Sequence, residues 1–421
     1  MRHPKLLTTL KTYNGSLFLS DLVAGATVAM VALPLSLAIA IASGADPAKG
    51  LITAIVAGFL ISLLGGSRVQ IGGPTGAFIV VVFGVIAEYG YDGLVLATLM
   101  AGVILLATGY FRAGRLIAYI PEAVVNGFTI GIAVVIAISQ LPDFLGLTVE
   151  HVPADFIEKI PVLWEARASF SLLAFAIAIL TLVLIVALRR FAPRVPGLIV
   201  AVAAGSLAVF LFGLPVDTVG SRFGSLPNQL PWPALPDLSF PGMVQLFPSA
   251  VVIAFLAGVE SLLSAMVADR RIEGHHRPNA ELLAQGAANI GSALFGGLPA
   301  TGAIARTATN VRAGGKTPVA GIVHAVVILL VMLVAAPLAG YLAMPALAAL
   351  LVITAWNMSE PHKWSEHFAG RMSDTVLLLL TLILTVVVDL TVAIAVGVGI
   401  GLALRLSRRA NVESDWTPPE R

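Results

Sequence analysis

The chain has 421 residues, of which 58% are hydrophobic and 11% charged, and its mean hydropathy is +0.96. Soluble proteins carry about 25% charged residues, so this composition excludes a soluble globular protein and indicates an integral membrane protein. The net charge of +2 comes from basic residues scattered through short loops, which predicts no nucleic-acid partner, and the absence of Cys excludes a disulfide framework, thiol catalysis and Cys-ligated metals.

Apolar runs of about 20 residues, the length that crosses a bilayer as a helix, recur from Asp21 to Arg405. No polar block is long enough for a separate soluble domain, so we predict an all-α polytopic membrane protein. The runs are continuous rather than alternating, which argues against a β-barrel. The predicted spans are residues 20–42, 50–65, 92–111, 117–140, 170–189, 196–213, 246–268, 279–295, 318–342 and 344–356.

Further apolar segments complete this prediction. Those at residues 75–87 and 302–311 are too short to cross a hydrocarbon core of about 30 Å at about 1.5 Å per residue. The region 376–406 is interrupted by Asp389 and is divided into two short helices. The total is fourteen segments in two sets of seven. We expect a cytoplasmic N-terminus at 1–19, a first repeat at 20–213, an extracellular connection at 214–243, a second repeat at 244–406 and a cytoplasmic tail at 407–421.

The distribution of basic residues supports this segment count. If the N-terminus is cytoplasmic, Arg306 lies within the membrane and most of the 25 Lys and Arg residues lie inside. Only Lys49, Lys159, Arg167 and Arg222 fall in outside loops. Under the positive-inside rule, a correct count of membrane crossings places most Lys and Arg residues in cytoplasmic loops. Because each half has an odd number of segments, the halves have opposite orientations and form an inverted repeat. The only long loops are expected at 142–168 and 213–242.

A repeated Gly-rich motif precedes both short segments. Residues 72–77 read GGPTGA and residues 296–303 read GGLPATGA. Glycine and proline allow an extended approach, and the helix that follows begins with backbone N–H groups that lack an intrahelical partner. An anion at the helix start satisfies these donors and meets the positive end of the helix dipole. We predict that the two motifs face each other and form an anion site; the alternative is that they merely kink two transmembrane helices.

Side chains near these motifs extend the prediction. Arg306 lies about one turn beyond the second motif, and a charge near mid-membrane costs at least about 2.5 kcal/mol. It is interpreted as a fixed positive charge beside the anion; the alternatives are extension to the cytoplasmic side or a structural ion pair with Glu260. Pro34 is expected to loosen the first span and free carbonyl groups near the substrate. The predicted binding residues are Thr75, Gly76, Ala77, Thr301, Gly302, Ala303 and Arg306, with Leu35 and Ile39 as apolar pocket walls.

Glu260 lies in the middle of the span 246–268. Burial favours the neutral form of a carboxylate, so protonation of Glu260 is a candidate coupling step for transport. A Na⁺ site needs several hard oxygen ligands, which one Glu and a few hydroxyls supply poorly, so H⁺ is preferred over Na⁺ as the coupling ion. The adjacent His275 and His276 lack Cys or acidic companions at ligand spacing and predict no metal site.

Four stretches of the sequence are similar to those of one known family: DLVAGATVAMVALPLSLAIAIASG, GGSRVQIGGPTGAF, AYIPEAVVNGFTIGIA and GLPATGAIARTATNVRAGGKTPVAGIVHA. Over essentially its whole length the chain resembles the SulP (sulfate permease) family of anion transporters. The resemblance implies a seven-plus-seven inverted repeat shared with uracil permeases, core and gate domains, and an elevator-type motion. It implies that the third and tenth segments, after Thr75 and Thr301, cradle the anion and that Arg306 matches the arginine of the tenth segment.

The chain departs from the family pattern at two points. The family usually ends in a cytoplasmic STAS domain, whereas this chain stops at Arg421 after the basic stretch RLSRRANVESDW, and truncation is favoured over natural absence. The position of Glu260 is an aspartate in Na⁺-dependent bicarbonate members of the family, and the longer Glu again favours protons.

The sequence therefore predicts a secondary active transporter, not an enzyme, that moves a C4-dicarboxylate, sulfate or bicarbonate by proton symport without a cofactor. An anion channel or an uncoupled anion exchanger of the same fold is the alternative. The expected location is the bacterial cytoplasmic (inner) membrane with both termini cytoplasmic. The expected partners are a small anion, the lipid bilayer and a second copy in a homodimer, for which the family often uses the STAS domain.

Overall fold

The structure is a computed structural model that describes residues 3–112, 114, 120–149, 152–153, 155–193, 195–272, 274–369 and 371–407. These residues are mostly helical. The longer helices are α2 (Gly15–Ala42), α3 (Pro47–Leu64), α4 (Ile79–Tyr110), α5 (Glu122–Ser139), α8 (Leu172–Phe191), α9 (Gly197–Leu211), α11 (Phe240–Ile272), α12 (Pro278–Leu294), α14 (Val319–Ala339), α15 (Met344–Met358), α17 (Met372–Val387) and α18 (Leu390–Ser407).

Short elements connect them. The strands are β1 (Gly72–Gly73) and β2 (Thr301–Gly302), which form one two-stranded sheet. The short helices are α1 (Lys5–Thr9), η1 (Leu10–Thr12), η2 (Gly76–Phe78), α6 (Leu141–Leu145), α7 (Phe156–Glu165), η4 (Ala166–Ser169), α10 (Val219–Phe223), α13 (Ile304–Arg312), η5 (Pro361–Lys363) and α16 (Trp364–Ala369).

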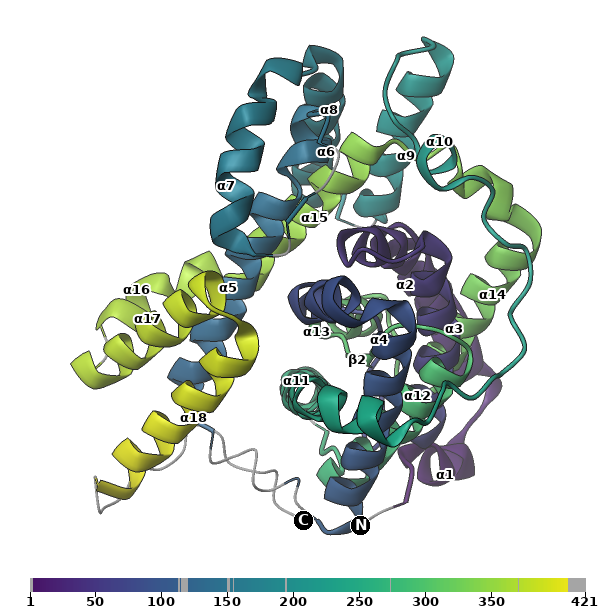
Figure 1. The fold of residues 1–421 in the computed structure, drawn as a ribbon. Helices are drawn as coiled ribbons and strands as arrows, with labels where there is room; N and C mark the ends of the chain where they lie inside the picture. Colours follow the sequence, from purple (N-terminus) through teal and green to yellow (C-terminus); the bar gives the residue numbers. More distant parts are fainter. Residues whose placement is uncertain are drawn as a thin grey trace.

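The helices gather in two groups (Figure 1). The core group, defined as α2, α3, α4 and α11 to α14, surrounds the β1–β2 sheet. The gate group, defined as α5 to α9 and α15 to α18, lies beside it, and its helices α9 and α15 pack against α2. Each group combines helices from both halves of the sequence, so neither half folds into one group by itself.

Seven helices within the described ranges are long and apolar enough to cross a membrane: Gly15–Ala42, Pro47–Leu64, Gly76–Tyr110, Glu122–Leu145, Leu172–Phe191, Phe240–Ile272 and Val319–Ala339. Shorter apolar helices lie at Gly197–Phe212, Met372–Val387 and Leu390–Leu404. A polytopic helical membrane protein is therefore confirmed. The fourteen-segment inverted repeat and its domain boundaries stay predictions.

Several predicted breaks coincide with backbone features. The predicted segments 75–87 and 92–111 join in one helical stretch that turns at Gly90, where φ is 71° and ψ is 179°. A left-handed φ suits glycine, which has no β-carbon to clash. The predicted segment 302–311 is confirmed as α13, and the predicted division at Asp389 is confirmed because α17 ends at Val387 and α18 begins at Leu390. The predicted start of the span 117–140 lies outside the described residues.

Pro34 does not interrupt its helix, and the expected loosening with freed carbonyl groups stays a prediction. Helix α2 continues from Gly15 to Ala42 with Pro34 inside it. Transmembrane helices tolerate proline because neighbouring helices and hydroxyl side chains satisfy the freed backbone groups. Close packing surrounds this part of α2, since a β-carbon on Gly50 of α3 would overlap the Ser36 carbonyl.

The predicted long loop at residues 142–168 does connect two candidate spans, but it contains the short helices α6 and α7, which were not predicted. The Asp155 side chain caps α7 by accepting a hydrogen bond from Ile157 N. Phe156, Ile160 and Leu163 follow the three-to-four-residue spacing of an amphipathic helix. This pattern was present in the sequence but was too short and too polar to count as a membrane span.

Candidate functional site

The two Gly-rich motifs meet among the helices of the core group. Strands β1 and β2 pair antiparallel, with Gly72 opposite Gly302 and Gly73 opposite Thr301. The backbone bond from Ala303 N to the Ile71 carbonyl extends this pairing. The prediction that the motifs face each other is therefore confirmed as geometry. The alternative, in which the motifs merely kink two continuous helices, does not account for a sheet that forms between the motifs.

A helix begins directly after each strand. Thr75 precedes η2, which contains Gly76 and Ala77 and continues into α4, and Ala303 precedes the first residue of α13. All of Thr75, Gly76, Ala77, Thr301, Gly302 and Ala303 are buried. The structure thus brings together the six backbone and hydroxyl positions proposed for anion binding, and two helix starts point toward one region.

One face of α11 supports both motifs. The carbonyl of Ala257 accepts a hydrogen bond from Thr301 Oγ1 at 2.8 Å. Ser261 contacts Gln70 just before β1, and Ser264 Oγ donates to Thr307 Oγ1 of α13 at 3.2 Å. Positions 257, 261 and 264 are spaced by four and three residues and so share a helix face. This face fixes the relative position of the two motifs.

Arg306 lies within the core group and is 1% exposed. Its Nη2 donates to Ser36 Oγ of α2 at 3.1 Å, whereas its Nε and Nη1 have no hydrogen-bond partner in the described structure. A β-carbon on Gly73 would overlap Nη1, so the guanidinium lies directly against β1. Burial excludes extension to the cytoplasmic side. Unused N–H groups of a buried cation are suited to an anionic ligand.

Glu260 is the acidic residue beside the first motif. Its Oε2 accepts a hydrogen bond from Thr75 Oγ1 at 2.9 Å, and the residue as a whole is half-buried. Among the described residues, no ion pair of 4 Å or less joins Glu260 to Arg306. The structural ion pair considered as an alternative is therefore not formed. A protonatable carboxylate therefore lies directly beside the start of the first motif.

Leu35 and Ile39 are buried in the apolar core, on either side of Ser36 along α2. Ser36, rather than either apolar residue, makes the contact with Arg306. Their role as pocket walls stays a prediction. Sequence analysis missed Ser36 and Gln70, although a hydroxyl inside an apolar span and a glutamine before a Gly-rich motif were visible signals.

A second buried carboxylate, Glu281 of α12, serves the fold. Its Oε2 accepts from the backbone N–H groups of Gly66 and Ser67, and its Oε1 accepts from Ser261 Oγ and Gln285 Nε2. Glu281 is 0% exposed. With both oxygens engaged, this carboxylate has no free acceptor for transport chemistry, and it holds the chain before β1 against α11 and α12.

The gate group covers the first motif. A β-carbon on Gly76 would overlap Met358 Sδ of α15 and would lie 3.5 Å from Ile136 Cδ1 of α5. Ile304, which begins α13 directly after the buried second motif, is 39% exposed. The candidate site therefore lies at the boundary between the two groups.

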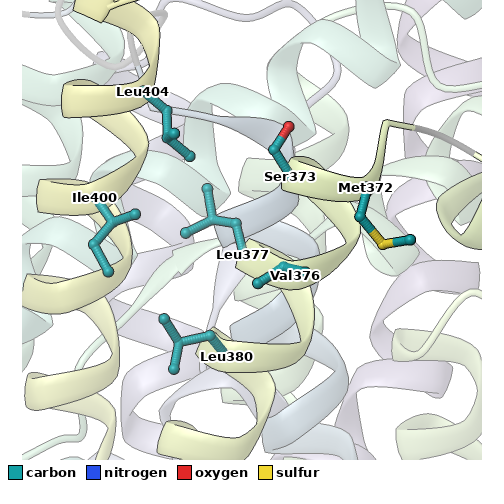
Figure 2. A pocket seen from close by; sticks show the side chains of 7 residues that line it. All are labelled: Met372, Ser373, Val376, Leu377, Leu380, Ile400 and Leu404. Atoms are coloured by element: carbon teal, nitrogen blue, oxygen red, sulfur yellow. The ribbon is translucent and has the colours of Figure 1, made fainter.

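The groove between α17 and α18 does not fit an anion. Figure 2 shows the side chains of a groove of about 460 Å³ between α17 and α18, lined by Met372, Ser373, Val376, Leu377, Leu380, Ile400 and Leu404. Six of these side chains are apolar and none is charged. The groove lies on the gate group and lacks the fixed positive charge that Arg306 gives to the motif site.

Gly302 is a position where the sheet tolerates no side chain. A β-carbon there would overlap Gln70 Nε2, which is buried and donates to the carbonyl and hydroxyl of Ser261. We expect Gly302→Ala to displace Gln70 and to lower the free energy of unfolding by about 1–3 kcal/mol. Thermal unfolding of the detergent-purified protein measures this loss.

Gly84 of α4 is the matched control for this substitution. A β-carbon on Gly84 would meet no atom within 4 Å, and Ala is favoured over Gly in helices by about 1 kcal/mol. Gly84→Ala should therefore leave the unfolding temperature unchanged or raise it. Equal behaviour of the two variants would show that the close packing at β2 has no influence on stability.

The fold and the site define a class of protein: a helical membrane protein in which two helix starts meet beside a buried arginine. A model described as the sulfate permease family matches residues 18–400. The chain belongs to the sulfate permease family of anion transporters.

Individual relatives agree with this assignment. YvdB of Bacillus subtilis, a candidate sulfate transporter, is 44% identical over 372 residues, covering 88% of this chain and 70% of YvdB. The bicarbonate transporter BicA of Picosynechococcus is 32% identical over 342 residues, covering 78% of this chain and 59% of BicA. The chain thus spans between about three fifths and seven tenths of these relatives. Both are named as transporters, which places the chain among transporters rather than enzymes.

Solved structures share the fold. The transmembrane domain of a cyanobacterial BicA matches with a TM-score of 0.79 and 29% identity, covering 93% of this chain and 98% of that domain. SLC26A9 matches with a TM-score of 0.87 at 17% identity, covering 96% of this chain and 68% of SLC26A9, and at that identity the likeness concerns the fold alone.

Proposed function

We propose that this protein is a secondary active transporter that carries a small anion between the two Gly-rich motifs. The observation that carries the proposal is the β1–β2 pairing beside Arg306. It gathers two helix starts and the unpartnered Nε and Nη1 groups of a buried guanidinium in one place. These are the groups that bind an anion through backbone donors and a fixed positive charge.

The proposed substrates are sulfate, bicarbonate or a C4-dicarboxylate. Each presents several oxygen acceptors on a small frame, which suits paired backbone donors and one guanidinium. The relatives support the first two candidates, because YvdB is named for sulfate and BicA for bicarbonate. No cofactor is needed for this binding chemistry.

Glu260 is the proposed coupling residue, with H⁺ preferred over Na⁺. It is bonded to Thr75 at the start of the first motif, so a change in its protonation alters the charge directly beside the anion. Protonation of Glu260 removes a negative charge that would repel the anion. Proton binding and anion binding therefore favour each other. The outcome is symport.

The proposed transport step is an elevator-type displacement of the core group against the gate group. Both motifs, Glu260 and Arg306 belong to the core group, so they would move together. The covering contacts of Gly76 with Ile136 and Met358 and the exposure of Ile304 support a state that is open beside α13 and closed beside α4. We place the protein in a bacterial inner membrane with cytoplasmic termini, as a homodimer.

Uptake into proteoliposomes tests this proposal. We expect labelled sulfate, bicarbonate, fumarate or succinate to accumulate against its gradient when the outside is acidic, and only weakly without a pH gradient. Accumulation driven by the pH gradient eliminates a channel. Equal uptake with and without the gradient, or exchange that requires a trapped anion, would instead support an uncoupled exchanger of the same fold.

A further inference from the structure

Lys159 of α7 is buried in the gate group although it is a lysine. Only 3% of the residue is exposed. Lysine is almost never fully buried without a paired charge, and no ion pair of 4 Å or less involves Lys159 among the described residues. The buried ammonium group must therefore be stabilised by a contact other than an ion pair with a described residue.

The Lys159 ammonium lies over an aromatic ring of the other helix group. Its Nζ is 5.4 Å from the centre of the Phe83 ring, within the range of a cation–π contact. Phe83 belongs to α4 of the core group, eight residues after Thr75, which is about 12 Å along a helix at about 1.5 Å per residue. The ring also packs near Gly44, where a β-carbon would lie 3.3 Å from Phe83 Cδ2.

This contact joins the two groups on the side of the site that is closed. Thr75 and Gly76 lie beneath Phe83 on the same helical stretch, and Gly76 is covered by Ile136 and Met358. The opposite helix start, at Ile304, is exposed. Any displacement that opens the Thr75 side must separate Phe83 from Lys159.

Separation releases the lysine into water. Burial lowers the pKa of Lys159, while the nearby Asp155 carboxylate raises it. The buried position thus disfavours the charged form relative to water, and an opened site would present a fully hydrated ammonium at its outer entrance. A cation at the mouth of a cleft raises the local concentration of anions.

Resting on the proposed transport function, we propose that Lys159 closes the extracellular side of the anion site through its contact with Phe83 and recruits external anions when that contact opens. The residue is a positioning residue on α7, outside the two Gly-rich motifs. The proposal thus gives a role to α7, a helix that contributes no residue to the two Gly-rich motifs.

Cross-linking tests the closure, because the chain has no native Cys. Lys159 reaches Phe83 through a full side chain, so Cys residues at these positions would be too far apart for a direct disulfide. We therefore use Lys159→Cys with Phe83→Cys and a reversible bifunctional methanethiosulfonate whose spacer matches the lysine side chain. Uptake should be lost on cross-linking and restored by reductant, while each single-Cys variant treated alike keeps its uptake.

Two results would overturn the closure. One is a complete cross-link with unchanged uptake, and the other is the failure of the pair to cross-link at all. Both are distinct from a failure of the transport function, in which the untreated protein would show no uptake of any anion offered.

Lys159→Met tests recruitment. We expect the KM for external anion to rise about three- to tenfold and to lose its dependence on ionic strength, while the KM for anion presented on the cytoplasmic side stays unchanged. Lys159→Arg should restore the external KM. A purely structural role would change the KM for external anion and the KM for cytoplasmic anion equally, and that result would refute recruitment.

Lys49 provides the matched control. Its Nζ lies 4.9 Å from the centre of the Tyr91 ring, but both residues belong to the core group. Lys49→Met therefore removes a lysine from a similar aromatic contact that does not join the two groups. A rise in external KM as large as that of Lys159→Met would show a general effect of surface charge and would contradict the assignment.

Discussion

Arg306→Ala should raise the dissociation constant for the transported anion about ten- to a hundredfold. Hydrogen bonds from a charged donor contribute about 1.5–3 kcal/mol, and about 1.4 kcal/mol corresponds to a tenfold change in affinity. The Nε and Nη1 groups of Arg306 are buried and without a partner in the described structure, so they are free to bind an anion. Binding of labelled anion to the purified protein measures the effect.

Arg312 is the control on the same helix. It is exposed, and its Nη2 donates to Thr309 Oγ1 at 3.3 Å. Arg312→Ala removes one positive charge from α13 but should leave anion affinity unchanged. If Arg306→Ala binds the anion as tightly as the parent protein, Arg306 serves packing through Ser36 and has no part in the site.

Glu260→Gln should abolish the response of uptake to a pH gradient while the protein stays folded. A glutamine carbonyl can still accept the hydrogen bond of Thr75, but the side chain cannot take up or release a proton. Uptake driven by an acidic exterior should therefore fall to the level measured without a gradient. Parallel assays with a Na⁺ gradient distinguish proton coupling from sodium coupling.

Glu281→Gln separates coupling from stability. The two oxygens of Glu281 accept four hydrogen bonds in a fully buried position, and an amide nitrogen there would face a donor. We expect a loss of about 1–3 kcal/mol in the free energy of unfolding. The remaining folded fraction of Glu281→Gln should keep the response of its uptake to a pH gradient.

Full proton-driven uptake by Glu260→Gln would exclude Glu260 as the coupling residue.

The central site was predictable because its signals are local in sequence. Two copies of Gly-Gly, Pro and Thr-Gly-Ala break apolar segments, and Arg306 is a charge where lipid-facing residues would be neutral. These features predicted the short segment that forms α13 and the facing arrangement of the two motifs. The need to satisfy backbone groups in the membrane favoured motifs that face each other, whereas their pairing as two strands was not predicted.

Other features depend on tertiary contacts that one sequence does not encode locally. Ser36 and Gln70 acquire roles only because α2 and the chain before β1 pack against Arg306 and Ser261. Helix α7 was missed because ten residues with internal Pro161 resemble a loop. Pro34 is accommodated inside a continuous α2, where packing against neighbouring helices supports the helix.

The β1–β2 pairing also sets an order of events during synthesis. The bond from Ile71 N to Thr307 Oγ1 joins residues 236 positions apart, and β1 has no sheet partner until β2 has been made. Contacts this distant in sequence form slowly, and unpaired strand edges are sites of misassembly. When only the first half has been synthesised, Gly72 and Gly73 therefore lack the strand that will later pair with them.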